Sequence, residues 1–334
     1  MRLVTVLVAS LAVVSALDYD QETSKVTLSI GKGAKVDIKF QLSTIYEDFL
    51  VFGPECKDAG SCSTEGHPVY DAAKDKVTLE DGKAKFNTFN TKLAKDVEVD
   101  TGDKTIKQDI SVVVGVVNDQ FKQESFPFEG VFGLKSGKDK PFDKLVSALD
   151  KKHLLIVPKY QNDTKSKPTL LLGAESKKAC GEFKLAESTS DVWTNDYVRK
   201  INDLDTTFKI APSLDKVYAV STNGLLLFGK QVLSENEYNN LLKYKVTYGG
   251  VEIEINPQDA YELQKDKNYE LQVMIADGKG FDLALPNSYF DNYCVKLAKD
   301  GDKYMVGLAE RQNGVGLAAM SLATLMGMFA LLRL

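Results

Sequence analysis

The sequence contains few of the residues that build common metal and nucleophile centres. Its 334 residues include only two histidines, one tryptophan and four cysteines. His67 and His153 lie far apart, and neither has the spacing of a zinc ligand set or stands with a Gly-x-Ser-x-Gly motif. The sequence therefore predicts no metal site and gives no reason to expect a cofactor.

The sequence also lacks a dense run of basic residues. Lys and Arg number 42 against 47 Asp and Glu, so the charges nearly balance. A groove for nucleic acid needs clustered positive charge to neutralise phosphates. We therefore expect no nucleic-acid partner.

The N-terminus has the pattern of a signal peptide. Met1 and Arg2 give a positive start, residues 3–14 are mostly apolar, and small residues stand at Ser15 and Ala16. This apolar run is too short to cross a bilayer as a helix. We predict a signal peptide over residues 1–16, a mature chain from Leu17, and passage through the secretory pathway to the cell surface or outside.

The C-terminus carries a second hydrophobic segment over residues 313–334. Residues 314–332 contain no charge. The small residues Asn313, Gly314 and Gly316 favour a GPI-attachment signal, although the usual polar spacer is almost absent. A retained membrane helix is the alternative, and either attachment leaves the folded part outside the cell.

Four cysteines in an exported chain favour disulfides. Cys56 and Cys62 enclose a short loop of polar and small residues and are expected to pair, which leaves Cys180 to pair with Cys294. Asn162 opens the only Asn-x-Thr sequon, so it is a predicted glycosylation site.

The chain is long for one compact unit, and its pattern is mainly β. With 43% hydrophobic residues it can fill two cores, so we expect two lobes and a monomer. Short apolar runs with a period of two dominate. Only residues 142–152 and 234–244 have a helical pattern, the second with Ser234 as a cap.

A weak internal repeat supports two related lobes. The stretch Phe-Gln-Leu-Ser-Thr-Ile around Ser43 resembles Ala-Val-Ser-Thr-Asn-Gly around Ser221, which is 178 residues later. The predicted lobes are residues 17–165 and 166–312.

Three further stretches carry a family resemblance. Residues 128–134 read Phe-Glu-Gly-Val-Phe-Gly-Leu, residues 167–174 read Lys-Pro-Thr-Leu-Leu-Leu-Gly-Ala, and residues 304–309 read Tyr-Met-Val-Gly-Leu-Ala. In this order and spacing, over nearly the whole mature chain, the sequence resembles the pepsin-like aspartic proteases (family A1). The resemblance implies two β-barrel-like lobes with few short helices, and each lobe gives one Asp-Thr-Gly turn to a shared cleft.

The same resemblance implies that the catalytic machinery is lost. The two aspartate positions fall on Ser43 and Ser221, while Thr44 and Thr222 keep the threonines that brace the paired turns. Peptide hydrolysis in this family needs two carboxylates that share a proton, and serine hydroxyls cannot replace them. We predict a pseudoprotease that binds a peptide or protein in the interlobe cleft.

Two rival functions stay open at this point. The first is an active aspartic-type endopeptidase that uses Glu47 or Asp48, although both should point away from the paired turns. The second is a structural surface protein without a ligand-binding cleft.

A literal Asp-Thr-Gly at residues 100–102 is interpreted as a polar hairpin tip, since no apolar strands flank it on both sides. Phe86 and Phe89 occupy the region of the family's flap. They are candidates to cover a ligand, but packing on the lobe is the interpretation that we favour.

Overall fold

The computed structural model of the chain is mainly β, with few and short helices among the residues that it describes. This confirms the class that the period-two pattern predicts. The described residues are 16–33, 35–58, 68–82, 89–102, 104–117, 128–161, 163–214, 216–265 and 267–312.

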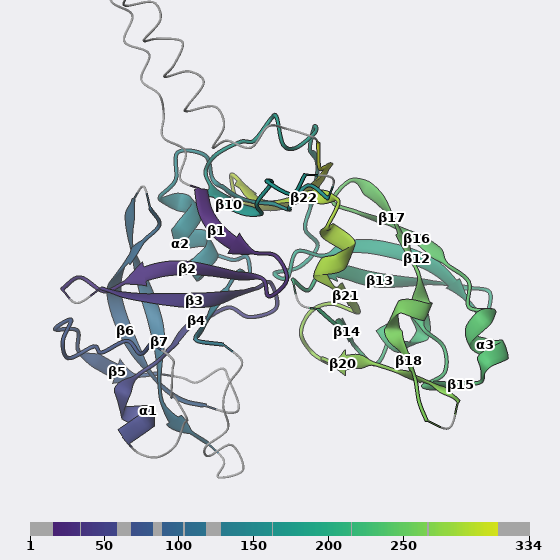
Figure 1. Cartoon of the computed structure of the whole chain (residues 1–334), viewed down its shortest axis with the longest axis horizontal. Helices are drawn as coiled ribbons and strands as arrows, with labels where there is room; N and C mark the ends of the chain where they lie inside the picture. The colour runs from purple at the N-terminus through teal and green to yellow at the C-terminus, as the bar shows by residue number, and fades with distance from the viewer. Residues whose placement is uncertain are drawn as a thin grey trace, which may run out of the picture.

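One sheet of thirteen strands takes its members from both ends of the chain. Its order is β11-β23-β22-β9-β10-β1-β2-β3-β8-β4-β7-β6-β5. In Figure 1, β1, β10 and β22 lie between a group of early strands and a group of later ones. The bounds are β1 Ala16–Asp20, β2 Lys25–Ile30, β3 Val36–Ser43, β4 Phe49–Phe52, β5 Leu79–Asp81, β6 Phe89–Asp100, β7 Thr105–Val116, β8 Gly130–Gly133, β9 His153–Val157, β10 Thr169–Leu172, β11 Lys184–Glu187, β22 Tyr293–Asp300 and β23 Lys303–Glu310.

The later strands form three smaller sheets. The largest has the order β12-β13-β21-β14-β20, the next β15-β19-β18, and the last pairs β16 with β17. Their bounds are β12 Asn195–Ile201, β13 Leu204–Pro212, β14 Tyr218–Val220, β15 Val232–Leu233, β16 Tyr244–Tyr248, β17 Val251–Ile255, β18 Tyr261–Leu263, β19 Tyr269–Leu271, β20 Val273–Ile275 and β21 Leu283–Leu285.

The helices are shorter than the sequence predicts. The bounds are α1 Pro54–Asp58, α2 Pro141–Ser147, α3 Glu235–Asn239, η2 Gly224–Leu227, η3 Pro257–Ala260 and η4 Asn287–Phe290, of which the η elements are 3-10 helices. The predicted cap of α3 is confirmed, because Ser234 and Glu237 form a reciprocal capping box. The two predicted helices end early, α2 at Ser147 and α3 at Asn239, and the next strands β9 and β16 begin at His153 and Tyr244.

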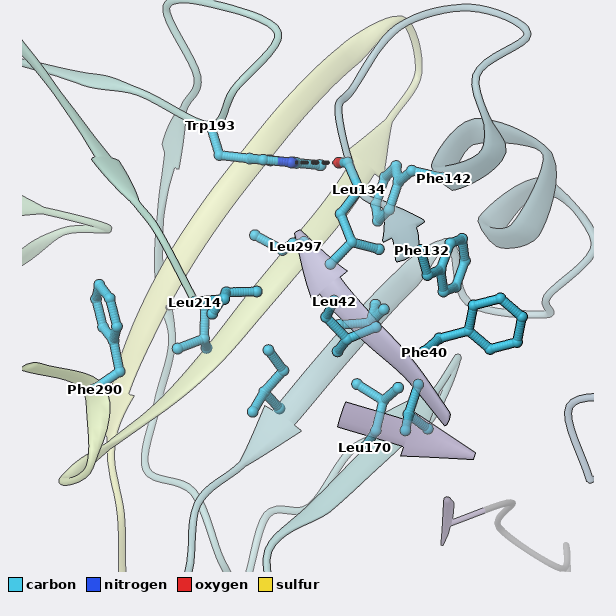
Figure 2. Close-up of a cluster of buried hydrophobic side chains, with 14 of the residues drawn as sticks. Phe40, Leu42, Phe132, Leu134, Phe142, Leu170, Trp193, Leu214, Phe290 and Leu297 are labelled. Carbon is cyan, nitrogen blue, oxygen red and sulfur yellow. Dashed lines mark hydrogen bonds between the residues drawn. The ribbon is translucent and has the colours of Figure 1, made fainter. Parts of the chain in front are cut away.

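A continuous core joins early and late parts of the chain. In Figure 2, Leu42, Leu134, Leu214 and Leu297 point toward one another from separate segments. The indole of Trp193 is fully buried beside them and donates a hydrogen bond from Nε1 to the Leu134 carbonyl at 2.6 Å. A buried indole N–H needs such a partner, so this bond fixes the segment before β12 against the one after β8.

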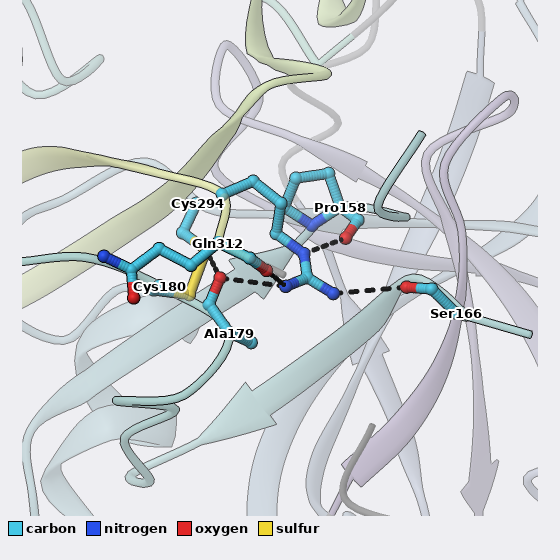
Figure 3. Close-up of a disulfide and its surroundings, with 7 residues drawn as sticks. Pro158, Ser166, Ala179, Cys180, Cys294 and Gln312 are labelled. Carbon is cyan, nitrogen blue, oxygen red and sulfur yellow. Dashed lines mark hydrogen bonds between the residues drawn. A yellow bond between two sulfur atoms is a disulfide. The ribbon is translucent and has the colours of Figure 1, made fainter. Parts of the chain in front are cut away.

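The predicted disulfide between Cys180 and Cys294 is confirmed, with an S–S distance of 2.05 Å (Figure 3). It ties the segment before β11 to β22. Beside it, the Arg311 guanidinium donates to the carbonyl of Pro158 at 2.7 Å and to Ser166 Oγ at 3.2 Å. The end of β23 is thus fixed to the connection between β9 and β10.

Several predicted features lie outside the described residues. They are the signal peptide apart from Ala16, Phe86, the sequon at Asn162, and the tail at 313–334. Cys56 is disulfide-bonded, but its predicted partner Cys62 also lies outside. Within the described part of the chain, no helix has the length and apolar character to span a bilayer.

Candidate functional site

Two copies of one three-strand unit position the candidate site. In the first copy, β3 runs parallel to β8, with Leu42 opposite Phe132, and the next strand β4 pairs with the same β8 in the antiparallel sense. In the second copy, β13 runs parallel to β21, with Pro212 opposite Leu285, and β14 pairs with β21 in the antiparallel sense. Each unit therefore makes one turn, after β3 and after β13.

This register corrects the position predicted for the second turn. Ser43 ends β3, and the residue at the matching place after β13 is Ser213, not Ser221. Ser221 follows β14, which is the outgoing strand of the second unit. The structural repeat therefore relates Ser43 to Ser213, 213 − 43 = 170 residues later, and does not coincide with the predicted repeat of 178 residues.

A hydrogen bond joins the two turns directly. Thr44 is completely buried, and its Oγ1 donates to the carbonyl of Pro212, the residue just before Ser213. The bracing role predicted for Thr44 therefore has a structural basis. The same role for Thr222 is wrong, because its exposed hydroxyl donates to Asp277 at 2.8 Å.

Leu214 occupies the place in the second turn that Thr44 has in the first. It has no hydroxyl, so it cannot return the hydrogen bond that Thr44 makes. Its backbone has a φ of 53°, in the left-handed region that β-carbon sterics disfavour for leucine. Its side chain is 2% exposed and packs beside Leu42 and Leu297 (Figure 2). The second turn is therefore held at Leu214 by apolar packing, whereas the first turn is held at Thr44 by a hydrogen bond.

The two turns carry hydroxyls where acid-base chemistry would need carboxylates. Ser43 and Ser213 are both buried, and the Ser213 hydroxyl finds no hydrogen-bond partner among the described residues. The Ser221 hydroxyl is occupied elsewhere, since it donates to Asp282 at 2.8 Å and accepts from the Gly224 N–H at 3.1 Å. A serine hydroxyl does not titrate near neutral pH, so these groups cannot share a proton as a carboxylate pair does.

The space beside the first turn is filled by apolar side chains. Ile45 is buried and packs in one cluster with Ala211, Ala219 and Ala284, which belong to the second three-strand unit. Lys279 Nζ lies over the ring of the adjoining Tyr46, 5.7 Å from the ring centroid. Lys279 belongs to the connection between β20 and β21, so this connection lies against the segment that follows the first turn.

The carboxylates of the rival hypothesis line a separate pocket. Glu47 and Asp48 lie with Asp109 of β7 around a cavity of about 200 Å³. Glu47 forms an ion pair with Lys140. Burial raises the pKa of Asp48, and Lys140 opposes that shift only in part. Lys140 neutralises Glu47, so Glu47 and Asp48 are not two free carboxylates that could share one proton.

The literal Asp-Thr-Gly is a hairpin tip, as its setting predicts. It closes the turn from β6 to β7, where Gly102 has a φ of 89° and donates its N–H to the Asp100 carboxylate at 2.9 Å. A hydrogen bond from Lys35 lowers the pKa of Asp100. This carboxylate is committed to turn geometry and to a surface ion pair.

Phe89 packs on the core rather than over a ligand. It is buried at the start of β6, and its ring meets Phe52 edge to face at 5.8 Å between centroids. His153 is buried as well, with Nε2 2.9 Å from the Ala174 carbonyl, and burial lowers its pKa. Within the described ranges, no group of three or more His, Cys, Asp or Glu side chains is placed to hold a metal ion.

No known family model matches the chain, and no curated protein matches it either.

Proposed function

We propose that this chain is a non-catalytic protein of pepsin-like, two-lobed fold that binds a peptide or protein outside the cell. The observation that carries the proposal is the Thr44 to Pro212 hydrogen bond between two equivalent turns. It brings together Ser43 and Ser213, the positions at which an active member of the family would need aspartates.

The paired turns lack the two groups that the family's reaction needs. One positioned acid or base contributes about 10²- to 10⁴-fold to a rate, and both are missing from the paired turns. Ile45 also fills the volume beside the first turn with apolar atoms, which disfavours an ordered attacking water. Both features support a role without turnover.

A binding role is supported by an open groove elsewhere on the protein. About 740 Å³ lies between the turn after β1, the segment around Lys159 and the start of η4. This volume falls within the range of ligand sites, and its lining is polar and mixed in charge, as with Lys159 and Asp291. Fold analogy alone cannot name the ligand.

An extracellular setting is supported by the signal-peptide pattern and by the disulfide, since such bonds persist in oxidising compartments. Surface attachment would come from the tail, either through a lipid or as a helix. A phospholipase that cuts GPI anchors distinguishes the two: release of the protein from cells indicates the lipid, and retention indicates the helix.

The proposal is tested by a search for peptide hydrolysis. The full chain is expressed in secreting cells, and the processed protein is incubated with unfolded protein substrates from acidic to neutral pH. We expect no cleavage above that of a mock purification. Cleavage that is blocked by a transition-state mimic of peptide hydrolysis and lost in Asp48→Asn would establish the active peptidase instead.

A further inference from the structure

A small pocket on the first strand group lies beside the paired turns but is separate from them. Its walls come from the segment after the first turn, from β6 and β7, and from the start of α2. The lining residues are Glu47, Asp48, Phe49, Leu93, Gln108, Asp109, Ser111, Asp139, Lys140, Pro141 and Lys144. Its volume of about 200 Å³ is below the range of drug-sized ligand sites. A single side chain is the kind of group that fits.

The charges around this pocket leave an excess of carboxylate. Four acidic residues line it against two lysines, so the formal balance is 2 − 4 = −2. Lys140 pairs with Glu47, and Lys144 pairs with Asp109 at 2.9 Å. After these pairs are counted, the carboxylates of the partly buried Asp48 and the exposed Asp139 remain to attract a positive group.

Gln108 gives an independent sign that a donor is missing. Its side chain is 1% exposed, and Nε2 donates to the Pro141 carbonyl at 2.9 Å. Its Oε1 is buried and has no hydrogen-bond partner among the described residues. A buried acceptor without a partner costs about 1–3 kcal/mol, which a donor entering the pocket would recover.

We propose that this pocket binds the positively charged side chain of a lysine or arginine in a peptide or protein partner. Ammonium and guanidinium groups carry only donors, whereas the Asp48 carboxylate and the unpaired Oε1 of Gln108 are acceptors. The ion pairs of Lys140 and Lys144 leave these two acceptors to the guest. The inference rests on the proposed binding function for the nature of the partner, and it adds the chemistry by which that partner is recognised.

A bare metal ion fits the pocket less well. Calcium takes six to eight oxygen ligands, whereas two of the four carboxylates here are held by lysines. Lys140 Nζ and Lys144 Nζ would also repel a divalent ion.

The test uses the processed full-length protein and short peptides as probes. Acetyl-Gly-Lys-Gly-amide and acetyl-Gly-Arg-Gly-amide are titrated by calorimetry and by NMR. Matched peptides carry norleucine for lysine, which keeps the four side-chain carbons without the ammonium, and citrulline for arginine, which keeps the length without the charge. We expect the charged peptides to bind at least about tenfold more tightly than their neutral partners, because charge-assisted hydrogen bonds are the stronger class.

Variants then locate the binding. Asp48→Asn and Gln108→Leu should each weaken binding of the charged peptide by at least about tenfold, since the first removes the negative charge and the second removes the amide acceptor. Asp150→Asn is the matched control, because that exposed carboxylate pairs with Lys104 outside the pocket. It should leave binding unchanged. Gln108→Leu should hold its unfolding midpoint near that of the parent, since it also removes an unpaired oxygen.

Three outcomes would overturn the inference. They are equal binding of charged and neutral peptides, binding that survives both pocket variants, and competition by calcium chloride at constant ionic strength. None of these outcomes bears on the proposed lack of catalysis, which the cleavage assay tests separately.

Discussion

The hydrogen bond from Thr44 gives a direct test of which residues form the second turn. Thr44→Val replaces the hydroxyl by a methyl group of similar size and keeps the burial. It leaves the Pro212 carbonyl buried without that donor. The loss of a buried partner costs about 1–3 kcal/mol, so the free energy of unfolding should fall by that amount.

Thr222→Val is the matched control, because it makes the same chemical change at the position that the sequence motif favours. The Thr222 hydroxyl is exposed and can exchange its bond to Asp277 for water. Removal of that exposed hydrogen bond should cost at most about 0.5 kcal/mol. The expected contrast is therefore a large effect at Thr44 and a small one at Thr222.

Urea unfolding followed by tryptophan fluorescence suits this comparison. Trp193 is the only tryptophan, and it lies in the same core, bonded to the Leu134 carbonyl. The slope of the transition should be equal in both variants and the parent, so that midpoints compare directly. A Thr222→Val effect equal to or larger than that of Thr44→Val would refute the assignment of Ser213 to the second turn.

Three other predictions concern stability. Burial by itself raises the pKa of Asp143, but the hydrogen bonds from Lys299 and Tyr304 and the charge of Lys299 together outweigh it and lower the pKa. Asp143 therefore stabilises the fold at pH values above the unfolded carboxyl pKa of about 3.9. This stabilisation is lost as the pH falls through the lower pKa that Asp143 has in the folded protein. Asp143→Asn should therefore flatten the acid limb of a profile of melting temperature against pH. Replacement of both Cys180 and Cys294 by alanine should cost about 2–5 kcal/mol in denaturant unfolding, since the bridge spans 114 residues; an unchanged midpoint would contradict this. Gly133→Ala should fail to give folded protein by circular dichroism, because a Cβ there would lie 2.6 Å from backbone atoms after the first turn, and a parent-like spectrum would refute it.

The sequence predicts those parts of the fold that depend on local patterns. Alternation of apolar residues marks the strands, and the Ser234 capping box is read from two residues three apart. The bond between Cys180 and Cys294 follows from the number of cysteines, because they are the two that remain once Cys56 is paired with Cys62. Each of these features is set by residues close together or by a small number of choices.

The second turn could not be placed in this way because its position depends on strand register. Ser221 and Thr222 repeat the letters of Ser43 and Thr44, whereas Ser213 stands in a segment without that motif. The useful signal was the order of strand types. The first turn follows a long strand and precedes a short buried one, and Ser213 has the same place after β13 and before β14.

Restored carboxylates at the two turns would not be expected to restore catalysis. Aspartates at positions 43 and 213 would face mutual repulsion that raises one pKa, which is the electrostatic part of the family's mechanism. The reaction also needs a water molecule and a peptide between the carboxylates, and Ile45 fills the neighbouring space with apolar atoms. Leu214 cannot make the hydrogen bond that Thr44 makes at the first turn, so the second turn is held by the core contacts of Leu214 instead. The paired turns are thus built as an interior joint between two strand units. Under the proposed binding function, a partner would be received at an outer pocket instead, where the Asp48 carboxylate and the unpaired Gln108 Oε1 are the acceptors.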